Sequence, residues 1–268
     1  MFKIIIILAL FITVIPFFWT FLTSLKTQKD IMIGSFGFKP TLRSYKNLFF
    51  ERGSDFPRYT LNSLIVSCSS TVLCVIVGSF AAYSLSRFKF PFHISTILLS
   101  WIIVVQMIHP MGMVIPIFVI EKSLNIYDTY LGLILVYATI NLPFSVWMMK
   151  DYIDELPFSI EEAAMIDGCG WFGLLKYIVF PLIKPGFVAT VIFLFIFIWN
   201  EFLFALILTS SAEVMTLPPG MARLSQQYFI KYGEMSAAAI FSAIPVIILV
   251  GFIQKHLVRG LTMGAVKG

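Results

Sequence analysis

The chain has 268 residues, a mean hydropathy of +0.93 and charged side chains at only 12% of its positions, whereas soluble proteins carry roughly 25%. This composition excludes an ordinary soluble domain and indicates a membrane protein. The formal net charge of +5 is spread over several loops, so it predicts no nucleic-acid partner.

Six long apolar segments follow one another along the chain, and each provides the roughly 20 residues that a membrane-spanning helix needs. Five of them lack Asp, Glu, Lys and Arg, and the remaining one contains only Glu201. They are residues 4–25, 59–86, 90–120, 129–149, 185–212 and 235–254. The sequence therefore predicts an all-α polytopic membrane protein with six transmembrane helices, forming a single transmembrane domain over residues 1–268.

The first segment resembles a secretory signal peptide in its position, but its apolar run is longer than the usual central region of such peptides. No small-residue cleavage site follows it. We therefore expect this segment to be retained as a membrane anchor.

Residues 26–58 then form a polar and aromatic loop, and residues 210–234 form a second one. In the second loop, Pro218, Pro219 and Gly220 predict irregular structure.

Several apolar segments contain helix breakers and polar side chains, which need a protein or water environment at bilayer depth. Gln106 and His109 precede Pro110, and Asn141 precedes Pro143. We assign Gln106 and Asn141 to a pore or subunit interface. His109 is expected to bond to a neighbouring helix, and the three cysteines are expected to be free thiols without metal-ligand spacing.

Glu201 is the one acidic residue within the six predicted spans, and Asn200 lies beside it. A charge at this depth costs about 2.5–3.5 kcal/mol on insertion scales, so it should face protein or water. Asn200 and Glu201 are therefore candidates for the pore or for contact with another subunit. Two alternatives remain open, since Glu201 either reaches water at the end of its helix or takes part in proton coupling.

Residues 151–184 form a polar, helix-forming loop between two apolar segments. Pro157 suits the first turn of a helix, and Glu161 and Glu162 follow where the helix dipole favours negative charge. Ile160, Ala163 and Ala164 are spaced to share one face. Gly168 then predicts a left-handed C-cap. A second short helix is expected from Trp171 until Pro181 ends it. We interpret the loop as a docking surface for a soluble partner.

The spacing in this loop resembles the cytoplasmic signature of the inner-membrane subunits of binding-protein-dependent ABC importers. That signature is Glu-Ala-Ala, a Gly four residues later, then Ile and Leu-Pro, and here Phe180 replaces the Leu. Further motifs resemble the carbohydrate-import branch. They are SLKTQKDI at 24–31, EEAAMIDG at 161–168, WNEF at 199–202, TLPPG at 216–220 and RGLTMGAVKG at 259–268. The short N-terminus and the GAVKG ending resemble the second membrane subunit of that branch. The resemblance covers nearly the whole chain.

The resemblance implies that the chain forms half of a pore for a sugar or sugar derivative in the inner membrane of a prokaryote. Implied partners are a second, non-identical permease subunit, two cytoplasmic ATPase subunits and an extracytoplasmic solute-binding protein. No phosphate-cradling GxxxxGK[ST] motif occurs, so we expect no enzymatic activity and no bound cofactor, with ATP and Mg held by the partner ATPase. The residues expected to contact that ATPase are Glu161, Glu162, Ala163, Ala164, Asp167 and Gly168 in the loop, and Gly264, Ala265, Val266 and Lys267 at the C-terminus.

The same resemblance implies that both termini are cytoplasmic, because the loop at 151–184 must meet the ATPase. This orientation assigns nine Lys and Arg residues to the cytoplasmic side and ten to the other. The positive-inside rule slightly opposes it. The residues 210–234 are then external, either as a contact for the solute-binding protein or as a plain connector.

Three other interpretations compete with this one. A loop resting on the membrane surface is disfavoured because anionic lipid would repel its acidic residues. A stand-alone secondary transporter or channel would show symmetric halves and paired intramembrane charges, which the sequence lacks. An intramembrane enzyme would need paired catalytic groups at membrane depth, and His109 and Glu201 have no evident partners in the sequence.

Overall fold

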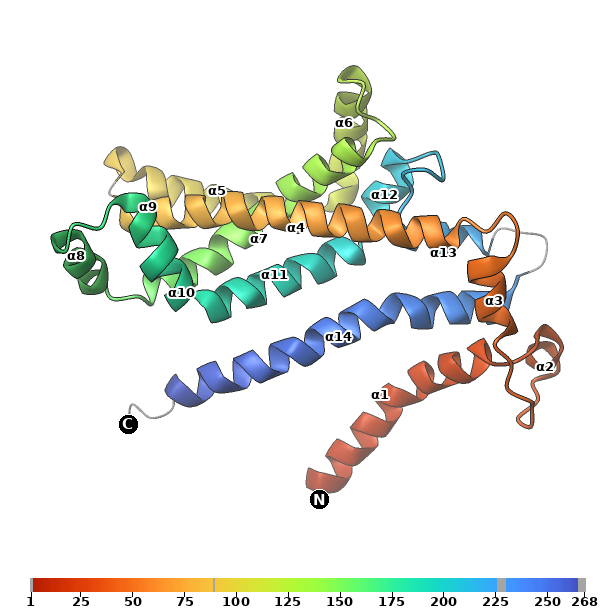
Figure 1. Ribbon diagram of the computed structural model, residues 1–268. Coiled ribbons are helices and arrows are strands. Elements are labelled where there is room, and N and C mark those ends of the chain that lie inside the picture. The colour runs from red at the N-terminus through yellow and green to blue at the C-terminus, as the bar shows by residue number, and fades with distance from the viewer. Residues whose placement is uncertain (1, 89, 226–229, 265–268) are drawn as a thin grey trace. The chain divides into compact units, whose positions relative to one another are not determined.

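The computed structural model describes residues 2–88, 90–225 and 230–264, which are helical with short connections and contain no strand (Figure 1). This agrees with the predicted all-α class. Apolar segments adopt helices because a helix satisfies its own backbone hydrogen bonds, which is required in lipid.

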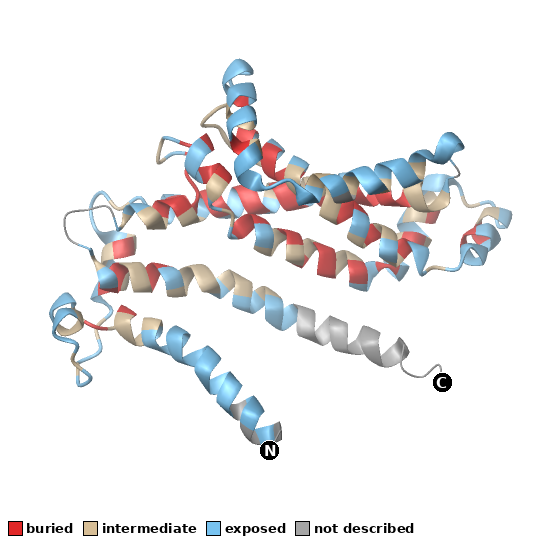
Figure 2. Cartoon of the chain, turned by 180° about the vertical axis from the view of Figure 1, so that it is seen from behind, coloured by how far each residue is buried: buried red, intermediate tan, exposed pale blue. Residues whose placement is uncertain are grey.

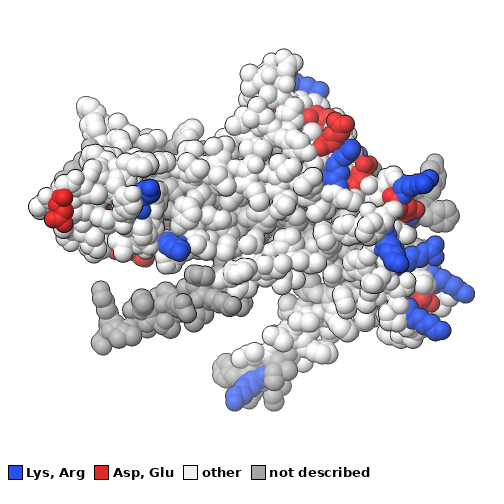
Figure 3. Space-filling view, viewed as in Figure 1, with Lys and Arg blue, Asp and Glu red and all other residues white. Residues whose placement is uncertain are grey.

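Within the described ranges, three helices are long and apolar enough to cross a membrane by themselves. They are α4 (Phe56–Arg87), α7 (Tyr130–Asp154) and α14 (Tyr232–Gly264, of which Tyr232–Phe252 was tested). Each coincides with a segment that the sequence predicted to span. On the face that Figure 3 shows, the surface over the middle of α4 carries no charged side chain.

The predicted span at 90–120 is broken in the structure. After the short η1 (Pro91–His93), α5 (Ile94–Met107) and α6 (Pro110–Ser123) meet at 99°. Pro110 has no N–H, and the residue before a proline avoids helical geometry. His109 accordingly has φ −66° and ψ 132°. The break is therefore a local consequence of this proline.

The predicted span at 185–212 is broken too. Helix α11 (Lys184–Trp199) ends before Asn200, and α12 (Leu203–Leu208) follows. Before α11, the segment Trp171–Leu182 meets it at 78°. If each of the two bent pairs counts as one span, the described chain has up to five spans. The first predicted segment forms α1 (Phe2–Ser24), whose described apolar part, Leu8–Ser24, is shorter than the others.

The chain divides into two compact units. Unit 1 comprises Met1–Ser63 and Ser211–Ile248, and unit 2 comprises Leu64–Ser210 and Leu249–Gly268, so that α4 and α14 contribute to both. Unit 1 also holds α1, α2 (Gln28–Ile33), α3 (Arg43–Phe50) and α13 (Leu217–Arg223). Figure 2 shows α1 exposed over most of its length. A helix that is apolar all round and exposed is suited to lipid contact.

Helix α13 corrects one sequence expectation. Pro218 and Pro219 were expected to prevent regular structure, but they lie at the first positions of this helix. The first N–H groups of a helix have no partner inside it, so a proline there costs no hydrogen bond. Leu217, which begins α13, donates its N–H to Ser63 Oγ at 2.7 Å.

In unit 2, α7 packs against α5 and α11, and close helix contacts depend on small residues. A Cβ at Gly78 on α4 would overlap the side chain of Ser145 on α7, and one at Gly186 on α11 would overlap the Tyr152 ring. Ser145 Oγ also donates to the carbonyl of Cys74 at 3.0 Å. Small residues that let backbones approach and hydroxyls that bridge them are typical of helix packing in membranes.

Candidate functional site

The loop at 151–184 contains the two predicted short helices. Helix α8 (Phe158–Ile166) begins directly after Pro157, with Glu161 in its first turn. At its end, the N–H of Gly168 donates to Met165 O at 3.1 Å and the N–H of Cys169 donates to Ala164 O at 3.0 Å. Gly168 has φ +82°. This is a Schellman C-cap, so the predicted left-handed glycine is confirmed.

The buried face of α8 differs from the expected one. Glu161 is 1% exposed and Ala164 is 8% exposed, whereas Ile160 and Ala163 lie on the exposed side. The spacing of Ile160, Ala163 and Ala164 had predicted one shared face. An acidic residue replaces Ile160 on the buried face because a cation from another helix meets it there.

That cation is Arg87, the last residue of α4. Its Nε lies 2.6 Å from Glu161 Oε1, and its Nη2 donates to the carbonyls of Ile153 at 2.8 Å and Leu156 at 3.0 Å. Tyr83 OH, one turn earlier on α4, donates to Glu161 Oε2 at 2.9 Å. Buried charges are tolerated when paired and hydrogen-bonded in this way. We call Tyr83, Arg87 and Glu161 the α8 clamp.

The outward face of α8 combines apolar and acidic groups. Ile166 is 85% exposed, and Glu162, Ala163 and Asp167 are exposed as well. Gly168 is also exposed at the end of the helix. The loop residues predicted to contact a partner are thus brought together on one short helix, except that Glu161 and Ala164 face inward. In Figure 1, α8 lies at one end of unit 2.

The second half of the loop packs inward. Helix α9 (Trp171–Leu174) continues through a π-helical turn, η2 (Leu175–Val179), into α10 (Phe180–Leu182). Leu174 and Val179 are fully buried. Pro181 was expected to end the helix, but the chain stays helical to Leu182. The wide π turn precedes a residue that offers no N–H and whose ring would crowd a regular turn.

The predicted pore residues fall into two places. Asn141 Nδ2 donates to Tyr137 O at 2.9 Å, and Asn141 and Gln106 line one cavity in unit 2. Asn200 is exposed, and its Nδ2 donates to Ile196 O at 2.8 Å. Glu201 accepts from Tyr137 OH at 2.6 Å and from the N–H groups of Phe204 at 2.9 Å and Ala205 at 3.2 Å. Glu201 therefore caps the start of α12.

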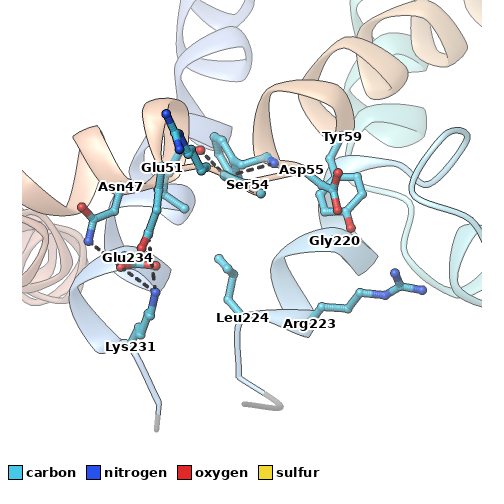
Figure 4. Close-up of a pocket in the computed structure, with 14 residues that line it drawn as sticks. Asn47, Glu51, Ser54, Asp55, Tyr59, Gly220, Arg223, Leu224, Lys231 and Glu234 are labelled. Atoms are coloured by element: carbon cyan, nitrogen blue, oxygen red, sulfur yellow. Dashed lines mark hydrogen bonds and ion pairs between the residues drawn. The ribbon is translucent and has the colours of Figure 1, made fainter. Parts of the chain in front are cut away.

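The loops at 26–58 and 210–234 come together in unit 1, a contact that no local sequence signal predicted. Asn47 Nδ2 donates to Glu234 Oε1 at 2.9 Å, and Gln28 Nε2 donates to Ile230 O at 2.8 Å. Lys231 Nζ lies 3.3 Å from Glu234 and 3.7 Å from Glu51. A cavity of about 420 Å³ is lined by four of these residues and by residues of α4 and α13: Asn47, Glu51, Lys231, Glu234, Tyr59, Gly220 and Arg223 (Figure 4).

The family can be decided from the sequence. The family model of the binding-protein-dependent transport system inner membrane component matches residues 74–263. The chain belongs to this family. The match includes the whole loop at 151–184 and the predicted pore residues.

Relatives of similar length extend the match over almost the whole chain. The inner membrane ABC transporter permease protein YcjP of Escherichia coli is 38% identical over 97% of this chain and 94% of its own length. The trehalose transport system permease protein SugB of Mycobacterium tuberculosis is 34% identical over 95% of this chain and 92% of its own. The trehalose/maltose transport system permease protein MalG of Thermococcus litoralis is 33% identical over 98% and 94%.

A solved structure has the same fold. It is a chain of a bacterial ABC transporter involved in the import of the acidic polysaccharide alginate, with a TM-score of 0.79 and 21% identity over 95% of each chain. At this identity the likeness concerns the fold alone. The chain is thus an all-helical, multi-pass member of the permease family.

Two further predictions concern the C-terminus and metal binding. The C-terminal contact residues Ala265, Val266 and Lys267 lie outside the described residues, and Gly264 is described only as the last residue of α14. No three His, Cys, Asp or Glu side chains gather as a metal site in the part of the chain that the structure describes.

Proposed function

We propose that this permease forms half of the translocation pore of an ATP-driven importer for a sugar or sugar derivative. It couples to a separate ATPase through α8. The observation that carries this proposal is the two-sided nature of α8, which buries Glu161 in the α8 clamp and leaves Glu162, Ala163 and Ile166 exposed. A helix that is bonded to its own protein on one face and exposed on the other can transmit the movement of a bound partner to the rest of the protein.

The α8 clamp connects α8 directly to the ends of two membrane helices. Arg87 joins α8 to the end of α4, and its bonds to Ile153 and Leu156 include the end of α7. Leu174 and Val179 pack in the same core cluster as Ala164, and Ile183, directly before α11, belongs to it too. A displacement of α8 would therefore also reach the start of α11. When the ATPase subunits close, displacement of α8 therefore moves helices that surround the pore.

The exposed face of α8 indicates the chemistry of its partner. Ile166 requires an apolar pocket, while Glu162 and Asp167 favour a cationic rim on the ATPase. In this proposal, the partner binds ATP and Mg and carries out the hydrolysis. The tail at 264–267 is proposed as a second contact with it. Both termini and the loop at 151–184 are then cytoplasmic, in the inner membrane of a prokaryote.

On the other side of the membrane from the ATPase, the proposed partner is a solute-binding protein. The second solved structure that resembles this chain is a bacterial alginate ABC transporter in complex with an alginate-bound periplasmic protein, with a TM-score of 0.60. In this chain, the cavity bordered by Glu51, Arg223 and Lys231 offers charges of both signs to such a partner. The pore is completed by a second permease subunit. Sugar is proposed as the substrate because the names of several relatives specify it.

The test is purification of the tagged chain from its own membranes in mild detergent, with co-purifying proteins identified by mass spectrometry. We expect an ATPase and a second permease subunit. Ile166→Asp and Glu162→Lys should release the ATPase but keep the second permease. Glu155→Lys is the matched control, because Glu155 is an exposed acid of the same loop outside α8. Recovery of the chain alone, active in liposomes without ATP, would identify a secondary transporter instead.

A further inference from the structure

A cavity of about 290 Å³ in unit 2 lies where the broken helices meet. Its wall includes the end of α5 and the start of α6, where the chain turns by 99°. Helices α7, α11 and α12 complete it. Broken helices often line substrate sites in transporters, because their interrupted backbone is tolerated only beside protein or a water-filled space.

The lining combines aromatic rings with two carboxamides. Phe144 and Phe197 face each other in a T-shaped arrangement, with centroids 5.2 Å apart. Gln106 and Asn141 are the amides. Every described residue that lines the cavity is uncharged: Val105, Gln106, Ile108, Pro110, Met113, Ile140, Asn141, Phe144, Phe197 and Phe204.

The amides have hydrogen-bonding capacity that their known contacts do not exhaust. Asn141 uses one N–H of Nδ2 on Tyr137 O, and an amide carries a second N–H and an acceptor oxygen. Gln106 is exposed. Glu201, three residues before the lining residue Phe204, is engaged by Tyr137 and the first N–H groups of α12. The cavity therefore offers neutral donors and acceptors.

We propose that this cavity binds one uncharged glycosyl unit of the transported substrate. Its Phe rings contact the C–H face of the sugar, and Gln106 and Asn141 bond to its hydroxyl groups. The volume is at the lower end of the roughly 300–1,000 Å³ of ligand pockets, which suits a single ring. This inference rests on the proposed function and narrows it to neutral sugars at this point of the pathway.

An acidic sugar is excluded by the same lining. A carboxylate or phosphate entering an apolar cavity without a counter-charge loses its hydration and gains no ion pair. A neutral hydroxyl group needs only the amide hydrogen bonds that Gln106 and Asn141 provide. The charge of the substrate thus decides whether it occupies the cavity.

The test is protection of introduced cysteines from a water-soluble thiosulfonate reagent in the full complex, with Cys68, Cys74 and Cys169 replaced by Ser. Asn141→Cys and Gln106→Cys report on the cavity. Ser123→Cys, an exposed position at the end of α6, is the control. The probes are glucose, xylose, maltose and trehalose as neutral sugars, and glucuronate and glucose 6-phosphate as charged ones.

We expect at least one neutral sugar to slow labelling at both cavity positions by about twofold or more, as half-occupancy requires, and to leave Ser123→Cys unaffected. The charged sugars should have no effect. Protection by the charged sugars, or by none of the six, overturns the proposal. Labelling that the second permease subunit blocks without sugar also overturns it, because the cavity is then a subunit interface.

Co-purification of the ATPase from the same membranes keeps the two proposals apart. If the ATPase is present and no sugar protects the cavity, the proposed function stands and this inference fails. If no ATPase is present in wild-type membranes, the proposed function itself fails.

Discussion

Arg87 Nε and Glu161 Oε1 lie 2.6 Å apart although 74 residues separate them in the chain, and their side chains are only 8% and 1% exposed. The pair fixes the first turn of α8 to the last residue of α4. Glu162, the next residue, is exposed. Two adjacent acids therefore have different tasks, one holding the helix and one facing outward.

Removing Arg87 should loosen the loop. In Arg87→Met, the Glu161 carboxylate stays buried without its counter-charge, and breaking a buried pair typically costs about 3–5 kcal/mol. We expect faster proteolysis within 151–184 and a lower unfolding temperature of the purified complex. Glu162→Gln is the matched control and should change neither measurement.

The double variant Arg87→Met with Glu161→Met distinguishes the cost of an unpaired buried charge from the cost of substituting these two positions. Replacing both charges by apolar side chains of similar volume is often close to neutral. The double variant should therefore recover much of the stability lost in Arg87→Met. Equal loss in the single and double variants would contradict a role for the unpaired charge.

Gly168 should be sensitive to substitution because its φ of +82° is left-handed. An L-residue pays about 1–2 kcal/mol there, so Gly168→Ala should disturb the turn between α8 and α9. Gly168→Asp should remain in the membrane and hydrolyse ATP without uptake. Gly168→Asn should be milder, since Asn tolerates this conformation. Paired measurements of ATP hydrolysis and uptake provide the readout.

Gly170→Ala is the control for this series. Gly170 has φ −74°, and a Cβ there meets nothing within 4 Å. Full coupling in Gly168→Ala, or an equal defect in Gly170→Ala, would show that the left-handed turn does not matter for coupling.

The sequence predicted the parts of this site that depend on neighbouring residues. The cap at Gly168 follows from a few consecutive residues, and so does the start of α8 after Pro157. Arg87 was not predicted as the partner of Glu161, because a contact across 74 positions leaves no local periodicity. An acid among apolar helix positions was the one available signal, and it was read as part of an outward face.

Prolines explain most differences between the predicted and observed elements. The sequence indicated helix breakers at Pro110 and Pro181. It did not indicate whether each proline would bend the helix, end it or be accommodated within it. Pro110 separates two helices, Pro181 lies within helical chain after a π turn, and Pro218 lies in the first turn of a helix that begins at Leu217. The outcome depends on whether the preceding carbonyls find other partners, which is decided by packing.

The α4–α7 contact provides a test of the fold. A Cβ at Gly78 would overlap Ser145, and overpacking usually costs about 1–3 kcal/mol. Gly78→Ala should therefore lower resistance to unfolding in denaturing detergent, and adding Ser145→Gly should restore it by making room. Gly112→Ala, with open space around it, should be neutral. Additive losses in the Gly78 and Ser145 double variant would contradict this contact.

Substitution of Glu201 can distinguish a structural role of this residue from a role in proton coupling. Its carboxylate accepts from Tyr137 OH and from two N–H groups at the start of α12, and hydrogen bonds to a charged group contribute about 1.5–3 kcal/mol each. Glu201→Gln retains only one acceptor oxygen. We therefore expect lower thermal stability but ATP-driven uptake with an unchanged pH profile. Asn200→Ala, which loses a single bond to Ile196 on an exposed face, should cost less. Uptake that loses its pH dependence in Glu201→Gln while stability stays intact would instead assign proton transfer to this residue.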